Sequence, residues 1–350
     1  MPRTRVLHAL GFAAFFSWTA WALAAPQPAS VSGPARHGRP LTVDGAGFGA
    51  KAVAAPLAWD DLESGRFSTA WRSVRGLDVN ADHNRHPRSK YNGHKNFDAS
   101  SQFGFVEGHD VYPRWFCQYW FMVSTNWDWG NTLPDGDRAW LSNIKMFRMW
   151  NPSDKIDENF VFSIQGWENQ VVYNMEYTDA DPSGSYTLFQ TKSAMTKGRW
   201  HLMQFEYAEN SALKAPDGQF RFWFDGQDMG GRTNIVTRED FAEFKRPGVL
   251  GFHCVWAPNY KKGESAREPN DFYLDDIYMD NTWARVELGN NPSYEDCLVR
   301  EIQIPIAWSE RSIRFTVNQG ALPPGTTAYL FVTDASGARN ATGIPVTIAK

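Results

Sequence analysis

The feature that most constrains this chain is a repeated alternation of short aromatic or β-branched runs with clusters of Gly, Pro, Asn and Asp. Long amphipathic helix patterns are almost absent. Aromatic and β-branched residues favour pleated sheets, and frequent turn residues between them are typical of a sandwich or barrel. The sequence therefore predicts an all-β fold. The clearest predicted strands are Arg114–Ser124, Asn143–Trp150, Phe160–Trp167, Val171–Tyr177, Trp200–Tyr207, Phe220–Asp225, Val249–Val255 and Phe272–Met279.

Charge and aromatic content narrow the class of ligand. The formal net charge is −4 and no long block of Lys or Arg occurs, so the sequence predicts no binding to nucleic acid. Aromatic residues make up 15% of the chain, with 16 Trp. Part of this excess is structural, and part could stack on sugar rings.

Residues 76–100 mix Asn, Asp, His, Arg and Lys and predict a long loop.

The first 25 residues have the form of a secretory signal peptide. Arg3 and Arg5 precede an apolar run from Val6 to about Trp21, and Ala22-Leu23-Ala24 provides a small-x-small cleavage pattern. No later run reaches about 18 apolar residues, so no membrane span is expected after cleavage. We therefore expect a secreted, periplasmic or cell-surface protein.

Three cysteines follow the predicted signal peptide: Cys117, Cys254 and Cys297. In an oxidising compartment one disulfide and one free thiol could form, and the sequence does not select the pair. No Cys/His spacing indicates zinc or an iron–sulfur cluster. No cofactor is therefore required by the sequence.

The two ends of the chain share one pattern. Leu41–Gly49 resembles the opening hairpin of an IPT/TIG domain, a small immunoglobulin-like fold, and predicted strands after residue 297 resemble its remainder. Neither end alone has enough strands to enclose a core. We expect residues 26–55 and 297–350 to form one discontinuous immunoglobulin-like sandwich, with residues 56–296 inserted in a loop. The alternative is two unrelated tails that pack on the large domain.

The central region, residues 56–296, resembles concanavalin A-like lectin/glucanase jelly rolls, which include sandwich-fold polysaccharide lyases. The motifs that carry the resemblance are Gly198-Arg199-Trp200-His201, Asp217–Gly226 and Asp275-Asp276-Ile277-Tyr278. The resemblance implies a two-sheet antiparallel jelly roll that handles carbohydrate. These motifs are mostly turns and core positions, so they indicate the fold more than the activity.

Strand alternation separates two faces in the central region. One face of each strand is apolar, and the other mixes Trp with Arg, Gln and Glu. Such a mixture suits a sugar, because rings stack on its apolar face while planar polar groups bind its hydroxyls or carboxylate. The alternative is that these tryptophans pack beneath long loops. The predicted carbohydrate-binding residues are Arg148, Trp150, Gln165, Trp167, Gln204, Glu206, Arg221 and Trp223.

The sequence leaves catalysis open. A retaining glycosidase needs two neighbouring carboxylates, and Glu206 has Gln204 where the second would stand. A uronate lyase needs Arg, Gln or Asn to neutralise a carboxylate and Tyr or His to move a proton. Tyr119, Tyr173 and His201 are candidates for the second role. The motifs of alginate lyases with this fold are not present, so the enzyme question stays undecided, with a lyase favoured over a hydrolase.

A structural calcium ion is a separate expectation. Jelly-roll modules often bind Ca²⁺ where the first and last strands meet, with carboxylates as ligands. Asp61, Glu63 and Asp275 occupy the matching positions.

The sequence thus predicts a secreted protein that binds a polysaccharide or cell-surface glycan in a concave groove. The alternatives are a polysaccharide lyase that cleaves an acidic glycan, and a structural or adhesive surface protein.

Overall fold

The computed structural model describes residues 25–96, 102–104, 111–127, 143–150, 159–167, 170–178, 185–249 and 271–350. The fold is an all-β arrangement of antiparallel sheets, as the sequence predicts. No helix in this part of the chain is long and apolar enough to cross a membrane. Residues 1–24 of the predicted signal peptide, Cys254, and all but the first residue of the predicted strand Val249–Val255 lie outside the described residues.

Residues between the two ends form a large two-sheet sandwich of jelly-roll type. Its larger sheet, called the large sheet below, has the order β15-β14-β13-β8-β17-β6-β5, and β3 also pairs with β17. These strands are β3 (Ala58–Asp60), β5 (Asp78–Asn80), β6 (Asn92–Asn96), β8 (Arg114–Val123), β13 (His201–Ala208), β14 (Gly218–Phe224), β15 (Gln227–Ile235) and β17 (Asp271–Asp280).

The opposing five-stranded sheet has the order β12-β11-β10-β9-β16. Its strands are β9 (Asn143–Trp150), β10 (Asn159–Trp167), β11 (Gln170–Thr178), β12 (Ser185–Ser193) and β16 (Arg246–Val249). A short pair of β4 (Ser73–Arg75) and β7 (Gln102–Gly104) lies beside it.

An aromatic core fills the space between these two sheets. Phe205 stacks on Phe147 of the facing sheet, with ring centroids 5.3 Å apart, and Phe162 contacts Phe222 at 4.5 Å. Each such side chain contributes about 1.5–3 kcal/mol when fully buried. The apolar faces predicted from strand alternation are confirmed on β13 and β14. Their buried members are Met203, Phe205, Tyr207, Phe220, Phe222 and Phe224.

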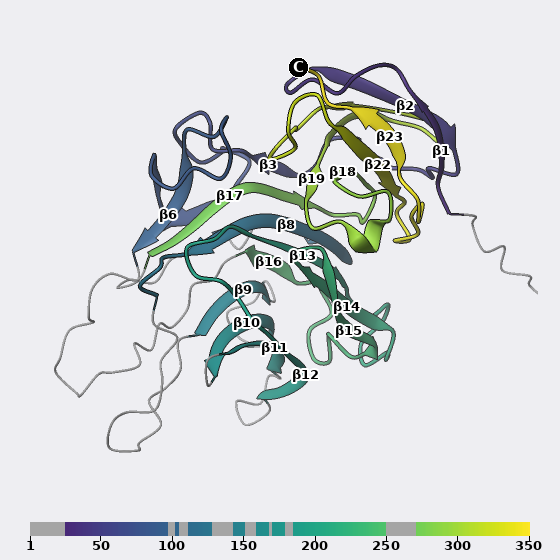
Figure 1. Ribbon diagram of the computed structural model, residues 1–350. Coiled ribbons are helices and arrows are strands. Elements are labelled where there is room, and N and C mark those ends of the chain that lie inside the picture. Colours follow the sequence, from purple (N-terminus) through teal and green to yellow (C-terminus); the bar gives the residue numbers. More distant parts are fainter. Residues whose placement is uncertain are drawn as a thin grey trace, which may run out of the picture.

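Strands from both chain ends form a second, smaller sandwich, shown in Figure 1 with the N-terminal purple strands beside the yellow C-terminal ones. One sheet has the order β1-β2-β21-β20 and the other β19-β18-β22-β23. Val43, Phe315 and Leu330 lie in its apolar core. The strands are β1 (Gln27–Val31), β2 (Pro40–Ala46), β18 (Arg285–Gly289), β19 (Arg300–Ile302), β20 (Ile304–Trp308), β21 (Ser312–Thr316), β22 (Thr327–Thr333) and β23 (Ile344–Thr347).

The small sandwich takes in β18, although β18 precedes residue 297, where the sequence analysis began the C-terminal segment. A short 3-10 helix, Tyr294–Asp296, connects β18 to β19. The IPT/TIG assignment of the two ends stays a prediction.

Several parts of the secondary-structure prediction differ from the structure, and the short strands β1, β3, β4, β7, β16 and β18 were not predicted. The segment 76–100, predicted as a loop, contains β5 and β6, which extend the large sheet beyond β17. Strands β12 and β15 were not predicted. Both are edge strands of their sheets, and β15 buries only Ile235, so its sequence lacks the alternating apolar pattern of an inner strand.

The outer face of the large sheet packs against the small sandwich through buried charges. Arg285 of β18 has no exposed surface, and it donates hydrogen bonds to Glu206 of β13 at 2.8 Å and to Glu287 at 2.9 Å. Burial would raise the pKa of Glu287, but Arg285 and Arg300 outweigh burial and lower it. The ion pairs therefore join the two sandwiches with the carboxyl of Glu287 charged.

A second buried cluster supports the same junction. The guanidinium of Arg85 contacts Asp276 of β17 and donates to Glu301 of β19 at 2.9 Å. It also lies over the ring of Trp120, 4.6 Å from the centroid. Three carboxyls, those of Asp275, Asp276 and Glu301, surround this one guanidinium, and burial raises the pKa of Asp275 and of Glu301. Arg85 therefore offsets part of the cost of burying them.

We predict that Arg285→Ala lowers the free energy of unfolding by about 3–5 kcal/mol, because the substitution leaves two buried carboxylates without their partner. Denaturant unfolding monitored by fluorescence measures the change. The control is Arg314→Ala, a change at an exposed arginine of β21, which should alter stability by no more than about 0.5 kcal/mol. Equal losses in the two variants would contradict the prediction.

Candidate functional site

The eight predicted carbohydrate-binding residues do not meet in one groove. Four of them lie on β9 and β10 of the five-stranded sheet, and the other four lie on β13 and β14 of the large sheet. The core of a sandwich lies between its sheets, so the outer faces of the two sheets point in opposite directions. The expectation of a single groove lined by all eight is therefore wrong.

The predicted residues of the five-stranded sheet are also separated along the strands. Arg148 lies opposite Val161 and its guanidinium lies 4.3 Å from the ring centroid of Trp150, whereas Gln165 lies opposite Asn143. Four residues along β10 span about 13 Å. Arg148 and Gln165 therefore do not form a close pair. The side chains of Gln165 and Trp167 lie outside the described part of the structure.

The centre of the outer face of the large sheet is covered. Gln204 is fully buried and donates to Glu287 of the small sandwich at 2.7 Å and to Gln118 at 2.8 Å. Trp223 is also fully buried, with the guanidinium of Arg339 5.4 Å from its ring centroid. The expectation that these two residues lie on an open surface is wrong, because the small sandwich packs on them.

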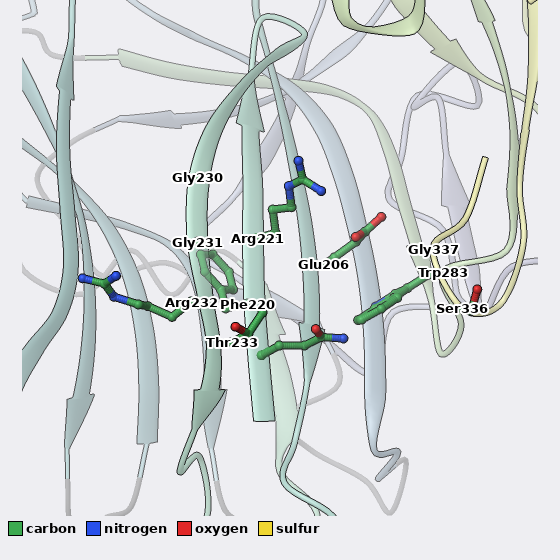
Figure 2. A pocket seen from close by; sticks show the side chains of 11 residues that line it. Glu206, Phe220, Arg221, Gly230, Gly231, Arg232, Thr233, Trp283, Ser336 and Gly337 are labelled. Carbon is green, nitrogen blue, oxygen red and sulfur yellow. The ribbon is translucent and has the colours of Figure 1, made fainter. Parts of the chain in front are cut away.

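The edge of the same face stays open and forms a pocket of about 390 Å³ (Figure 2). Two predicted residues, Glu206 and Arg221, line it. The other lining residues were not predicted as site residues, because they come from the hairpin β14–β15, from the segment between β17 and β18, and from the loop between β22 and β23. They are Gln219, Phe220, Gly230, Gly231, Arg232, Thr233, Trp283, Ser336 and Gly337.

Strand register explains how the floor of the pocket forms. Glu206 of β13 lies opposite Arg221 of β14, which lies opposite Gly231 of β15. Residues that pair across antiparallel strands share a face, so the carboxylate and the guanidinium stand side by side. Gly231 adds no side chain to this row. In Figure 2 the side chain of Arg232 points away from Glu206.

Glu206 is held in place by the small sandwich. Its Oε1 accepts the 2.8 Å hydrogen bond from Arg285, and only 6% of the residue is exposed. A Cβ atom added to Gly337 would lie 3.9 Å from Oε2, so this second oxygen faces the pocket wall formed by the loop. In Figure 2 the carboxylate points toward the side of the pocket on which Gly337 lies. Oε2 is thus positioned to accept hydrogen bonds from a ligand.

Arg221 is held by a carboxylate of its own hairpin. Its Nε donates to Asp228 Oδ2 at 3.1 Å, and its Nη2 also contacts this oxygen. Partial burial opposes ionisation of Asp228, but hydrogen bonds from Arg221 and the Gly230 amide outweigh it and lower the pKa of this carboxyl. The pair is therefore charged and fixes the direction of the guanidinium at the pocket edge.

Trp283 and the loop after β22 form the wall of the pocket. The indole Nε1 of Trp283 donates to the carbonyl of Trp115 at 3.1 Å, and Arg114 lies 4.9 Å from its ring centroid. Gly337 packs so closely that an added Cβ would lie 3.1 Å from Cε3 of this indole. A rigid apolar wall thus stands beside the polar floor.

The pocket carries few groups for bond cleavage. Among the described residues that line it, Glu206 is the one carboxylate and none is Tyr or His. The predicted proton-transfer candidates lie inside the protein: Tyr119 donates to the Met146 carbonyl at 2.8 Å, and Tyr173 is buried in the aromatic core. His201 contacts Asp225 at 2.7 Å and the Thr196 carbonyl at 2.8 Å. These three residues therefore have structural roles.

The expected calcium ligands do not converge. Asp61 accepts from the Glu63 amide, and Glu63 accepts from the Lys90 amide at 2.8 Å. Asp275 is buried beside Arg85 and accepts from Ser89 at 3.1 Å. Among the described residues no three His, Cys, Asp or Glu side chains lie close enough to share a metal ion. Asp61, Glu63 and Asp275 therefore do not form the expected site.

Two of the three cysteines lie in the described residues. Cys117 is in the core of the large sandwich and Cys297 is buried beside the carbonyls of Asn291 and Ser293. Both are free thiols, and burial raises the pKa of each. Cys117 and Cys297 therefore do not form a disulfide with each other.

No protein-family model and no curated protein matches the sequence. Among solved structures, the chain aligns with the endo-β-1,4-glucuronan lyase of the fungus Trichoderma reesei at 15% identity and a TM-score of 0.47, over 65% of this chain and 97% of the lyase. The PL-14 alginate lyase of Aplysia kurodai aligns at 12% identity and 0.41, over 66% and 99%. The carbohydrate-binding module CBM66 of Bacillus subtilis aligns at 9% and 0.31, over 59% and 97%. The jelly-roll assignment itself rests on the sheet order and the core.

Proposed function

We propose that this protein binds a short segment of a glycan in the pocket between the two sandwiches and does not cleave it. The observation that carries the proposal is the pairing of Glu206 and Arg221 on the floor of a pocket walled by Trp283. A carboxylate accepts hydrogen bonds from sugar hydroxyls, a guanidinium donates to sugar oxygens, and an indole covers C–H surfaces.

The size and construction of the pocket support a small, oriented ligand. Its volume of about 390 Å³ lies at the lower end of the ~300–1,000 Å³ typical of small-molecule sites. Both floor groups are held by other side chains, Glu206 by Arg285 and Arg221 by Asp228. A preorganised site loses less entropy on binding, which favours specific recognition over loose adhesion.

The chemistry of the described lining residues supports binding without cleavage. A glycosidase would need a second carboxylate about 5–10 Å from Glu206 to act as its partner. A lyase would need a proton acceptor such as Tyr or His beside the sugar. The lining residues include neither. The predicted export would bring the pocket into contact with extracellular polysaccharides.

We predict that Glu206→Gln and Arg221→Ala each weaken glycan binding at least about tenfold, because each loses a charge-assisted hydrogen bond worth about 1.5–3 kcal/mol. A glycan array identifies the ligand, and titration calorimetry then measures its affinity. The matched controls are the exposed residues Glu243→Gln and Arg314→Ala, which should bind as the parent does. The absence of binding to every glycan, or unchanged binding in both pocket variants, would overturn the proposal.

A second prediction concerns the wall of the pocket. Gly337→Leu should abolish binding, because its side chain would occupy the space between Trp283 and Glu206 Oε2. Gly337 has φ of +90°, so the substitution also strains the backbone by about 1–2 kcal/mol. Gly325→Leu, at φ of +78° in another loop of the small sandwich, is the control for that strain. We expect similar melting temperatures for the two variants and loss of binding only in the first.

A further inference from the structure

We infer that the pocket selects an uncharged saccharide over a uronate-containing one. The inference rests on the proposed function, because it concerns the ligand of the same pocket. Its basis is that the two charged groups on the floor, Glu206 and Arg221, are each already paired with an opposite charge, Glu206 with Arg285 and Arg221 with Asp228.

The carboxylate of Glu206 is the first obstacle to an acidic ligand. Its paired cation, Arg285, has no exposed surface and is shared with Glu287. Arg285 therefore neutralises the charge of Glu206 from the buried side of that residue. It presents no N–H group to the pocket. A uronate placed over Glu206 would bring two carboxylates together in a partly enclosed space, where like charges repel strongly.

Arg221 is the second obstacle. Its Nε and Nη2 both contact the same oxygen of Asp228. A uronate would form a two-point interaction with this guanidinium only by displacing Asp228, since a bidentate pair needs two adjacent N–H groups. Arg114, the cation nearest the other wall, lies over Trp283 and donates to the Ala335 carbonyl at 2.9 Å. Arg232 points away from the floor and donates to the Leu188 carbonyl at 3.1 Å.

A neutral sugar meets none of these costs. Its hydroxyls can donate to Glu206 Oε2, which faces the pocket, and accept from the side-chain amide of Gln219. Thr233 stands opposite Gln219 on β15 and adds a hydroxyl at the rim. Such a ligand keeps both the Glu206–Arg285 and the Arg221–Asp228 pairs intact, so their electrostatic stabilisation is not lost on binding.

The experiment compares glycans that differ only in oxidation of the C6 hydroxymethyl group. Oligosaccharides of β-1,4-glucan and β-1,4-glucuronan form one matched pair, and those of β-1,4-mannan and β-1,4-mannuronan form another. Calorimetric titration of the full chain at low and high salt gives the affinity for each. We expect the neutral member of the pair that binds to be favoured at least about tenfold, with little dependence on salt.

Asp228→Asn weakens the preference for the neutral glycan if the inference is correct. The substitution removes the carboxylate that holds Arg221, so the guanidinium becomes available and uronate binding should rise about tenfold or more. Asp240→Asn removes an exposed carboxylate elsewhere, 3.9 Å from Lys214, and should change neither affinity.

The outcomes separate this inference from the proposed function. If the unmodified chain binds the uronate member as tightly as the neutral one, and Arg221→Ala abolishes that binding, the inference is wrong while glycan binding stands. If Asp228→Asn leaves uronate binding unchanged, the inference is also wrong. If no saccharide binds to any form of the chain, the proposed function fails and the inference fails with it.

Discussion

The contact on which the arrangement of this molecule depends is the hydrogen-bonded ion pair between Arg285 and Glu206. A fully buried guanidinium is stable only with carboxylates around it, and these come from both sandwiches, with Glu206 on β13 and Glu287 on β18. The pair therefore fixes the position of β18 on the outer face of the large sheet. Trp283 precedes Arg285 by two residues and is placed over the edge of that face by the same contact. One buried pair thus both joins the sandwiches and builds the pocket wall.

Much of the fold could be predicted from the sequence because alternate residues of the inner strands enter the core between the two sheets. Strands β8, β13, β14 and β17 alternate large apolar residues toward a common core, and their predicted bounds agree with the observed ones to within a few residues. The edge strand β15 could not be found in this way. It buries one apolar residue and contains Gly230-Gly231, a pair that is typical of a turn. Strands β5 and β6 are short and polar, so the pattern gave no sign of them either.

The candidate site depends on contacts between residues far apart in the sequence, which the alternation of residues within a strand does not predict. Strand alternation correctly placed Gln204, Glu206, Arg221 and Trp223 on the face away from the core of the large sandwich. Whether that face is open depends on Glu287 and Arg300, which contact Gln204 from more than 80 positions along the chain. Nothing in the spacing of residues encodes such a pairing. The same limit applies to Trp283 and Gly337, which acquire a role only when the small sandwich has packed against β13 and β14.

The small sandwich has two opposite effects on the outer face of the large sheet. It removes Gln204 and Trp223 from solvent, which converts an open surface into an interior that contains the ion pairs of Arg285 with Glu206 and Glu287. At the edge it stops short of Arg221 and contributes a wall, so an open strip of sheet becomes a bounded pocket. A bare sheet face would accept a long polymer in several registers, with any charged groups facing solvent. A pocket whose length is limited by Trp283 and whose charges are already paired accepts a shorter segment, and it discriminates by the cost of breaking those pairs. The proposed selectivity would therefore follow from how the two sandwiches are joined.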